Sequence, residues 1–128
     1  PTPPEMDYTP EQRQQGQDLF QQYCSVCHGP GAGTSGPIPS LMYSTAETHA
    51  AWDAIVLGGA YVQKGMPEFS HAVDEAGSQA LRAYVIDTAK ATIGFCESVF
   101  REEYPELLEP VCEIPQVGGG DVAGGGGQ

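Results

Sequence analysis

The chain has few basic residues: Lys and Arg number 5 against 17 Asp and Glu, which gives a formal net charge of −12 over 128 residues. This balance argues against nucleic acid and anionic membrane surfaces as partners, because both attract clustered positive charge. The chain also lacks a run of 18 apolar residues and a basic segment followed by an apolar one. We therefore expect no transmembrane helix and no retained signal peptide, and we interpret the chain as mature or excised.

Regular structure is predicted to be scarce at the two ends, where many of the 17 Gly and 11 Pro residues gather. A folded part of about 90 residues has a thin apolar core, so a bound prosthetic group would help it to fold. We predict a Pro-rich linker or arm (1–8), a folded domain (9–94), a C-terminal extension (95–115) and a Gly-rich flexible tail or linker (116–128).

The periodic segments have helical spacing and none alternates as a strand does, which predicts an all-α fold of three to four helices. Thr9, Ser44 and Asp74 are predicted N-caps. Gly16 precedes Phe20 by one turn and would let another backbone approach closely. The helices are predicted over residues 10–23, 44–57, 74–91 and 95–104.

The most specific motif is Cys24-Ser25-Val26-Cys27-His28, which matches the C-x-x-C-H pattern of covalent haem attachment. Two thiols at this spacing reach the two vinyl groups of a haem, and the adjacent histidine then lies beneath the iron. A thioredoxin-like site would need a preceding strand. A zinc site would need a second compact ligand pair, and Cys96 and Cys112 are too far apart to supply one. The motif therefore predicts one covalently bound haem c.

Met66 is the predicted sixth ligand of the iron, because Gly65 and Pro67 flank it in a loop where a stiffened backbone can hold the thioether in place. His71 is the second choice. Met42 is expected to cover the haem edge, and His49 and His71 are expected to face solvent. The full set of candidates is Met6, Met42, Met66, His49 and His71.

Over residues 16–91 the chain resembles a class I cytochrome c domain. The small and aromatic residues at the crossing of the family's terminal helices are matched by Gly16, Phe20 and Tyr84. The helix that leads into the methionine loop is matched by Trp52, Ile55, Gly58, Gly65, Met66, Pro67 and Phe69.

Within that family, residues 65–69 and 81–85 are most similar to the small cytochromes that accompany, or are fused to, quinone-cofactor (PQQ) alcohol dehydrogenases. The resemblance implies haem contacts from Leu41, Trp52 and Phe69. It also implies a proline carbonyl that accepts a hydrogen bond from His28, for which Pro39 is the first choice and Pro37 the second.

Two further cysteines, Cys96 and Cys112, are predicted to form a disulfide. Haem attached by thioethers is normally matured outside the cytoplasm, which predicts a periplasmic or secreted protein in which spare cysteines pair. Closing this loop would stabilise the fold by about 3 kcal/mol and pin the extension to the helical body. The alternative is that one of the cysteines joins another chain.

If His28 and Met66 fill both axial positions, the domain transfers single electrons and is not itself an enzyme. The expected partners are a dehydrogenase donor and an oxidase or cytochrome acceptor, or a fused redox domain. The alternative is a haem peroxidase or gas-binding module with a labile sixth ligand, for which His71 and Asp74 are the only acid–base pair in view. The predicted partner contacts are Val62, Gln63, Lys64 and Phe69.

Overall fold

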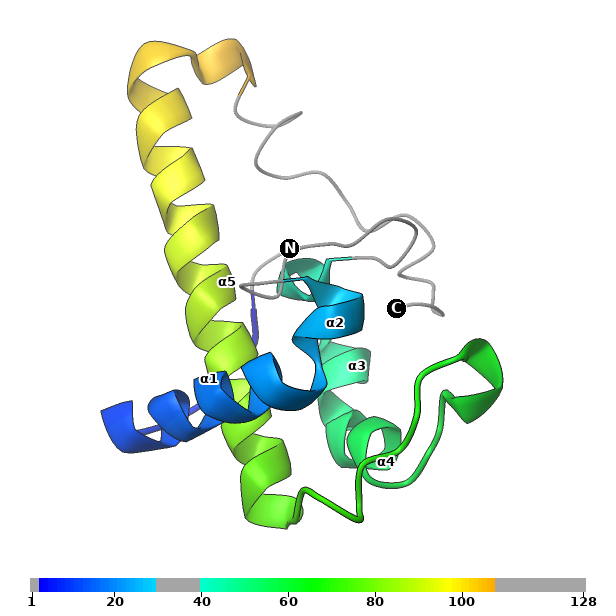
Figure 1. Ribbon diagram of the computed structural model, residues 1–128. Helices are drawn as coiled ribbons and strands as arrows, with labels where there is room; N and C mark the ends of the chain where they lie inside the picture. Colours follow the sequence, from blue (N-terminus) through cyan, green and yellow to red (C-terminus); the bar gives the residue numbers. More distant parts are fainter. Residues whose placement is uncertain (1–2, 30–39, 108–128) are drawn as a thin grey trace.

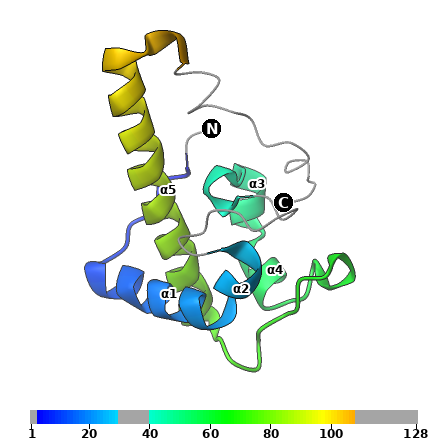
Figure 2. The ribbon, with the colours of Figure 1, turned by 45° about the horizontal axis from the view of Figure 1, so that its top comes forward.

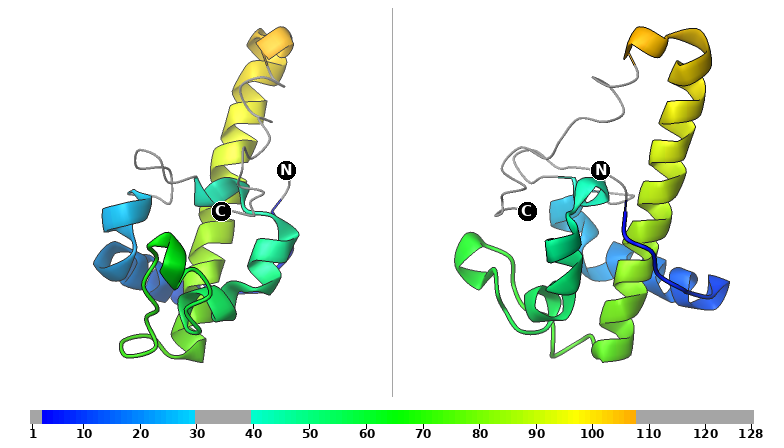
Figure 3. Two further views of the ribbon diagram at one scale, coloured as in Figure 1. Left: turned by 90° about the vertical axis from the view of Figure 1, so that its right-hand side faces the viewer. Right: turned by 180° about the vertical axis from the view of Figure 1, so that it is seen from behind.

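A computed structural model of the chain describes residues 3–29 and 40–107. In these two ranges the regular structure consists of α-helices and short 3₁₀ helices, as the sequence predicts. The main packing contact joins α1 (Pro10–Tyr23) to the first half of α5 (Glu75–Glu103), and α2 (Ser25–His28) contacts α1 (Figures 1 and 2). The next α-helix in the chain is α3 (Ala46–Ala50). The last turns of α5 extend beyond the other described helices (Figure 3).

Helix α1 begins and ends where the sequence predicts. The Thr9 hydroxyl accepts a hydrogen bond from the Gln12 amide at 3.0 Å, which satisfies a free amide of the first turn. Gly16 is buried at the crossing with α5, where an added Cβ would collide with the Ala80 carbonyl oxygen. The prediction that Gly16 permits a close backbone approach is therefore confirmed.

The helix predicted over residues 44–57 is instead two short helices, α3 and α4 (Trp52–Val56), which meet at Ala51. Its predicted N-cap is also wrong by one residue. Thr45 is the cap and its hydroxyl accepts from the Thr48 amide, whereas the Ser44 hydroxyl donates to the Leu41 carbonyl. Leu41 belongs to the preceding 3₁₀ helix η2 (Leu41–Tyr43), so Ser44 is the C-cap of that helix and not the N-cap of α3.

Helix α5 starts as predicted, with the Asp74 carboxylate accepting from the Gly77 amide at 2.8 Å. The predicted end near residue 91 is wrong, because α5 continues through Gly94 to Glu103 and includes the segment predicted as a separate short helix. A helical glycine costs about 1 kcal/mol relative to alanine, which a long packed helix tolerates. The helix stops before Pro105, whose ring disfavours helical backbone at the preceding residue.

The core forms where α1, α4 and α5 meet. Its buried members are Phe20, Trp52, Val56, Val73, Leu81, Tyr84 and Val85. Trp52 donates its indole N–H to the Ser78 carbonyl at 2.9 Å, so this ring is held against α5 by a buried hydrogen bond as well as by packing.

Residues 3–8, predicted as a linker or arm, contact α5. The Tyr8 hydroxyl donates to Asp87 at 2.8 Å, and Lys90 lies 3.4 Å from Glu5. Pro37, Pro39, Cys112 and the predicted tail over 116–128 lie outside the described residues, so the roles expected of them stay predictions. In the two described ranges, no helix is both long and apolar enough to cross a membrane.

Candidate functional site

The attachment motif lies at the turn that follows α1. The Cys24 amide still donates to the Phe20 carbonyl of α1, and the Cys24 carbonyl in turn accepts from the His28 amide at 2.9 Å. Gly29 then takes a φ of 81°, which only glycine adopts readily, and the chain leaves the turn. Both thiols and the imidazole are thus carried on one turn of helix, with Cys24 half-buried and Cys27 exposed.

The Cys24 thiol has an unfavourable environment for redox exchange. Burial, with a smaller contribution from Cys27, raises its pKa to about 12, so the thiol is neutral at pH 7. Cysteines of the thioredoxin type have a lowered pKa and react as thiolates. Among the described residues that precede the motif, the regular structure is the helix α1, and there is no strand. These observations argue against the thioredoxin-like interpretation.

His28 projects its ring into the interior, 6.5 Å from the Phe20 ring between centroids. Burial lowers the pKa of His28, so the imidazole is neutral and able to ligate a metal. Its Nδ1 atom is buried and has no hydrogen-bond partner among the described residues. A buried imidazole N–H without a partner is suited to donate a hydrogen bond to a backbone carbonyl, such as the one predicted at Pro39.

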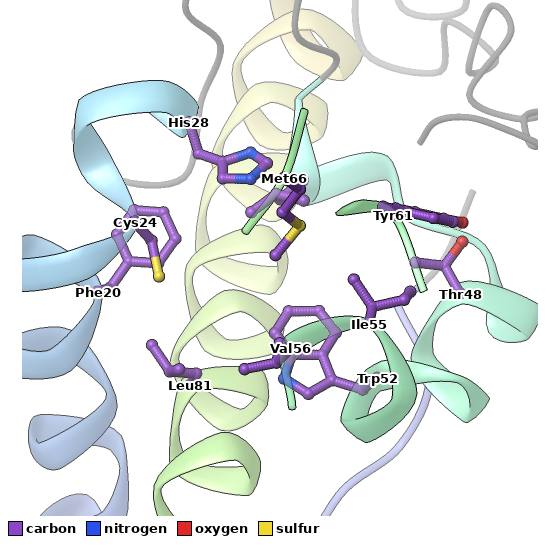
Figure 4. Close-up of a pocket in the computed structure, with 11 residues that line it drawn as sticks. Phe20, Cys24, His28, Thr48, Trp52, Ile55, Val56, Tyr61, Met66 and Leu81 are labelled. Atoms are coloured by element: carbon purple, nitrogen blue, oxygen red, sulfur yellow. The ribbon is translucent and has the colours of Figure 1, made fainter. Parts of the chain in front are cut away.

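Met66 reaches the same pocket from the loop after α4. The 3₁₀ helix η3 (Val62–Lys64) ends at Gly65, whose φ of 100° reverses the chain, and the Met66 amide donates to the Tyr61 carbonyl at 3.1 Å. The loop is then anchored to α4 by the Phe69 amide, which donates to Val56 at 2.8 Å. Figure 4 shows the His28 ring and the Met66 side chain close to each other in the pocket.

The pocket between these two side chains is mostly apolar. Its described lining comprises Phe20, Cys24, His28, Leu41, Thr48, Trp52, Ile55, Val56, Tyr61, Met66 and Leu81. Aromatic and aliphatic walls suit the flat macrocycle of a haem. An imidazole and a thioether are also a recognised pair of ligands for its iron. The donor set and the walls therefore fit the group that the motif predicts.

The structure separates the remaining predicted haem contacts. Leu41 and Trp52 line the pocket. Their contact with a haem stays a prediction. Phe69 is not among the lining residues: it packs beside the core with its ring 6.0 Å from that of Tyr23.

The other candidate ligands lie elsewhere. Met42 does not line the pocket, and His71 is exposed, as expected, in a polar groove that also contains Asp74. The expectation that His49 faces solvent is wrong. Its side chain is only 6% exposed because the ring stacks on Trp52 three residues later, with the two planes 6° apart.

Sequence reasoning missed two polar lining residues, Thr48 and Tyr61. Thr48 is a half-buried residue of the short helix α3, and Tyr61 precedes Met66 by five residues in a loop with no periodicity. Neither position carries a motif, so only the folded arrangement brings them to the pocket.

Comparison with known proteins identifies relatives of this chain. Residues 11–85 match the family model described as cytochrome c oxidase, cbb3-type, subunit III. A 1-butanol dehydrogenase (cytochrome c) of Thauera butanivorans is 38% identical over 87 residues, which are 67% of this chain and 13% of the relative. The quinohemoprotein alcohol dehydrogenase ADH IIB of Pseudomonas putida is 40% identical over 77 residues, 60% of this chain and 11% of the relative.

Among solved structures, the quinohemoprotein alcohol dehydrogenase ADHIIG of Pseudomonas putida superposes with a TM-score of 0.65 and 34% identity, over 70% of this chain and 13% of that one. This chain thus spans little more than a tenth of the length of these relatives. The matches confirm the resemblance drawn from residues 16–91. The chain belongs to the family of cytochrome c electron-transfer domains that this model describes, and it is homologous to the haem domains of quinohaemoprotein (PQQ) alcohol dehydrogenases.

Proposed function

We propose that this domain transfers single electrons through one haem c attached at Cys24 and Cys27, with His28 and Met66 as the axial ligands. When bound with both axial positions filled, such a haem supplies a one-electron couple and leaves no coordination site for a substrate. The observation that carries the proposal is the convergence of His28 and Met66, 38 positions apart in the chain, on one apolar pocket beside Cys24.

The residues around the pocket suit this role. The core rings of Phe20 and Trp52 form rigid walls, and the Gly65 turn and the Phe69 anchor hold the methionine loop against α4. Fixed ligand positions keep the structural change between the two oxidation states small. A soft thioether ligand also favours the reduced iron and raises its potential relative to a second imidazole.

The electron donor is proposed to be a quinone-cofactor dehydrogenase, as a separate protein or as a domain fused to this one. The homology to the haem domains of such dehydrogenases supports this proposal. The methionine loop offers a contact surface, since Val62 is 50% exposed and Gln63 and Lys64 are exposed beside it. The acceptor is proposed to be an oxidase or a second cytochrome.

Thioether attachment also favours a periplasmic or secreted location, in which Cys96 and Cys112 form the proposed disulfide. Cys96 lies on α5 and Cys112 outside the described residues.

The test is to produce the chain together with a haem-attachment system and to follow its reduction. Haem should stay with the denatured polypeptide after acid and organic extraction, and should be extracted from a Cys24→Ala/Cys27→Ala double variant. The reduction should follow a one-electron Nernst curve. Alcohol-reduced quinohaemoprotein dehydrogenase should then reduce the wild type. Extraction of haem from the wild type would overturn the attachment, and failure of the dehydrogenase to reduce an intact holoprotein would overturn the proposed donor.

A further inference from the structure

One end of the apolar pocket carries hydroxyl groups that the electron-transfer site as described does not use. The polar lining atoms are few: His28 and Met66 are assigned to the iron, Cys24 to attachment, and the Trp52 indole N–H to the Ser78 carbonyl. The hydroxyls of Thr48 and Tyr61 remain. Figure 4 shows both oxygens together on the side of the pocket away from Cys24, with His28 and Met66 between.

Tyr61 is held in place through its backbone. Its carbonyl accepts from the amides of Lys64 at 2.9 Å and of Met66 at 3.1 Å, so the backbone at Tyr61 belongs to the same turn that presents the methionine. The phenolic oxygen has no hydrogen-bond partner among the described residues. A phenol that lines a pocket without a partner has a donor free for a ligand.

Two further groups favour an anionic ligand at this end. The Lys64 ammonium lies 5.5 Å from the centre of the Tyr61 ring, and it is one of only 5 basic residues in the chain. The Thr48 hydroxyl is 3.1 Å from the Thr45 hydroxyl, and either can be the donor. When Thr45 donates, the Thr48 proton is available to a second acceptor. The pocket end thus offers two hydroxyl donors and a nearby positive charge.

The two edges of the haem macrocycle carry different groups. The vinyl groups that react with cysteines lie on one edge, and the two propionate carboxylates lie on the other. If Cys24 fixes the vinyl side, the carboxylates lie at the opposite end of the pocket. We infer that Tyr61 and Thr48 donate hydrogen bonds to a haem propionate there, with Lys64 as a nearby counter-charge. This inference rests on the proposed haem attachment and names residues that orient the group from the side opposite the thioethers.

A competing role for Tyr61 is a hydrogen bond to the Met66 sulfur. The structure argues against it, because Figure 4 shows the phenolic oxygen beside Thr48 and pointing away from that sulfur. A carboxylate is also the stronger acceptor, since hydrogen bonds to charged groups are roughly twice as strong as neutral ones.

The experiment compares Tyr61→Phe with the wild type as haem-loaded proteins, using resonance Raman spectroscopy of the propionate bending modes and the midpoint potential. Loss of the donor should shift the propionate band. It should also lower the potential, because a less neutralised carboxylate stabilises the oxidised iron. Tyr23→Phe is the matched control: the Tyr23 hydroxyl pairs with Gln22 outside the pocket lining, so neither signal should change.

Lys64→Gln should lower the potential by an amount that shrinks as salt is added, because its ammonium is exposed. The inference is overturned if Tyr61→Phe leaves the propionate band unchanged, whether or not the potential moves. It is also overturned if the sulfur-to-iron charge-transfer band changes instead, which would place the hydroxyl at Met66. A wild type without covalent haem would be recognised beforehand by extraction, and would count against the proposed function itself.

Discussion

Replacing Gly16 with alanine tests the contact on which the whole helical frame depends. An added Cβ would meet the Ala80 carbonyl oxygen and would lie 2.9 Å from the Tyr84 Cβ. Neither obstacle can move by a change of rotamer, so α1 and α5 must separate. Overpacking of this kind costs about 1–3 kcal/mol, and a collision with backbone belongs at the upper end.

The same substitution has a compensating benefit, since alanine is favoured over glycine within a helix by about 1 kcal/mol. The net result is a loss of about 2 kcal/mol, which lowers the melting temperature of a domain of this size by about 10 °C. The assay is thermal unfolding of the haem-loaded chain followed by far-ultraviolet circular dichroism.

Gly94→Ala is the matched control, because Gly94 lies within α5 and has no heavy atom within 4 Å of the added Cβ. It should gain stability by up to about 1 kcal/mol from propensity alone. If Gly16→Ala were as stable as Gly94→Ala, the close crossing of α1 and α5 would be refuted, and with it the geometry that positions Cys24.

Two titrating groups give further predictions. Burial, and less strongly the charge of Arg82, lowers the pKa of His49 from 6.5 to about 4, so protonation opposes folding and stability falls as the pH drops through that window. His49→Phe keeps the aromatic stack and removes the titrating group. Between pH 7 and pH 4, its free energy of unfolding in urea should rise relative to that of the wild type by up to about 3 kcal/mol. Equal pH dependence of the two proteins would contradict this. Burial alone would raise the pKa of Asp87, but hydrogen bonds from Arg13 at 2.7 Å and from Tyr8 lower it overall. The stability that Asp87 contributes is therefore present above pH 3.8 and is lost as the pH falls below that value. Asp87→Asn should be less stable than the wild type at pH 7, and its stability should depend less on acid pH. An unchanged unfolding midpoint at pH 7 would count against the contact of residues 3–8 with α5.

Local signals in the sequence account for much of the fold. Thr9 and Asp74 are caps whose side chains satisfy amides of the first turn, so the starts of α1 and α5 are set by nearby residues. The end of α5 is not local in this sense. A glycine weakens a helix without stopping it, and α5 continues through the exposed Gly94. The helix ends only before Pro105.

The site divides in the same way. His28 is identified by its motif, and Met66 by a loop flanked with glycine and proline, because both depend on short sequence patterns. Tyr61 lines the pocket from a turn in which its carbonyl accepts from the Lys64 and Met66 amides, an arrangement that no spacing in the sequence reveals. The burial of His49 likewise depends on a stack with Trp52 and on α5 behind it, so tertiary packing overrides the polar character of the residue.

The most direct test of the central claim is the absorption spectrum of the oxidised and reduced protein, with and without carbon monoxide, for wild type, Met66→Ala and Met42→Ala. Met42 is the control because it is a loop methionine outside the pocket lining. With Met66 on the iron, the oxidised wild type and Met42→Ala should show a near-infrared sulfur-to-iron band, and Met66→Ala should lack it. Among the three reduced proteins, only Met66→Ala should bind carbon monoxide. A wild type that lacks the band and binds carbon monoxide readily would contradict ligation by Met66 and would favour a peroxidase or gas-binding module.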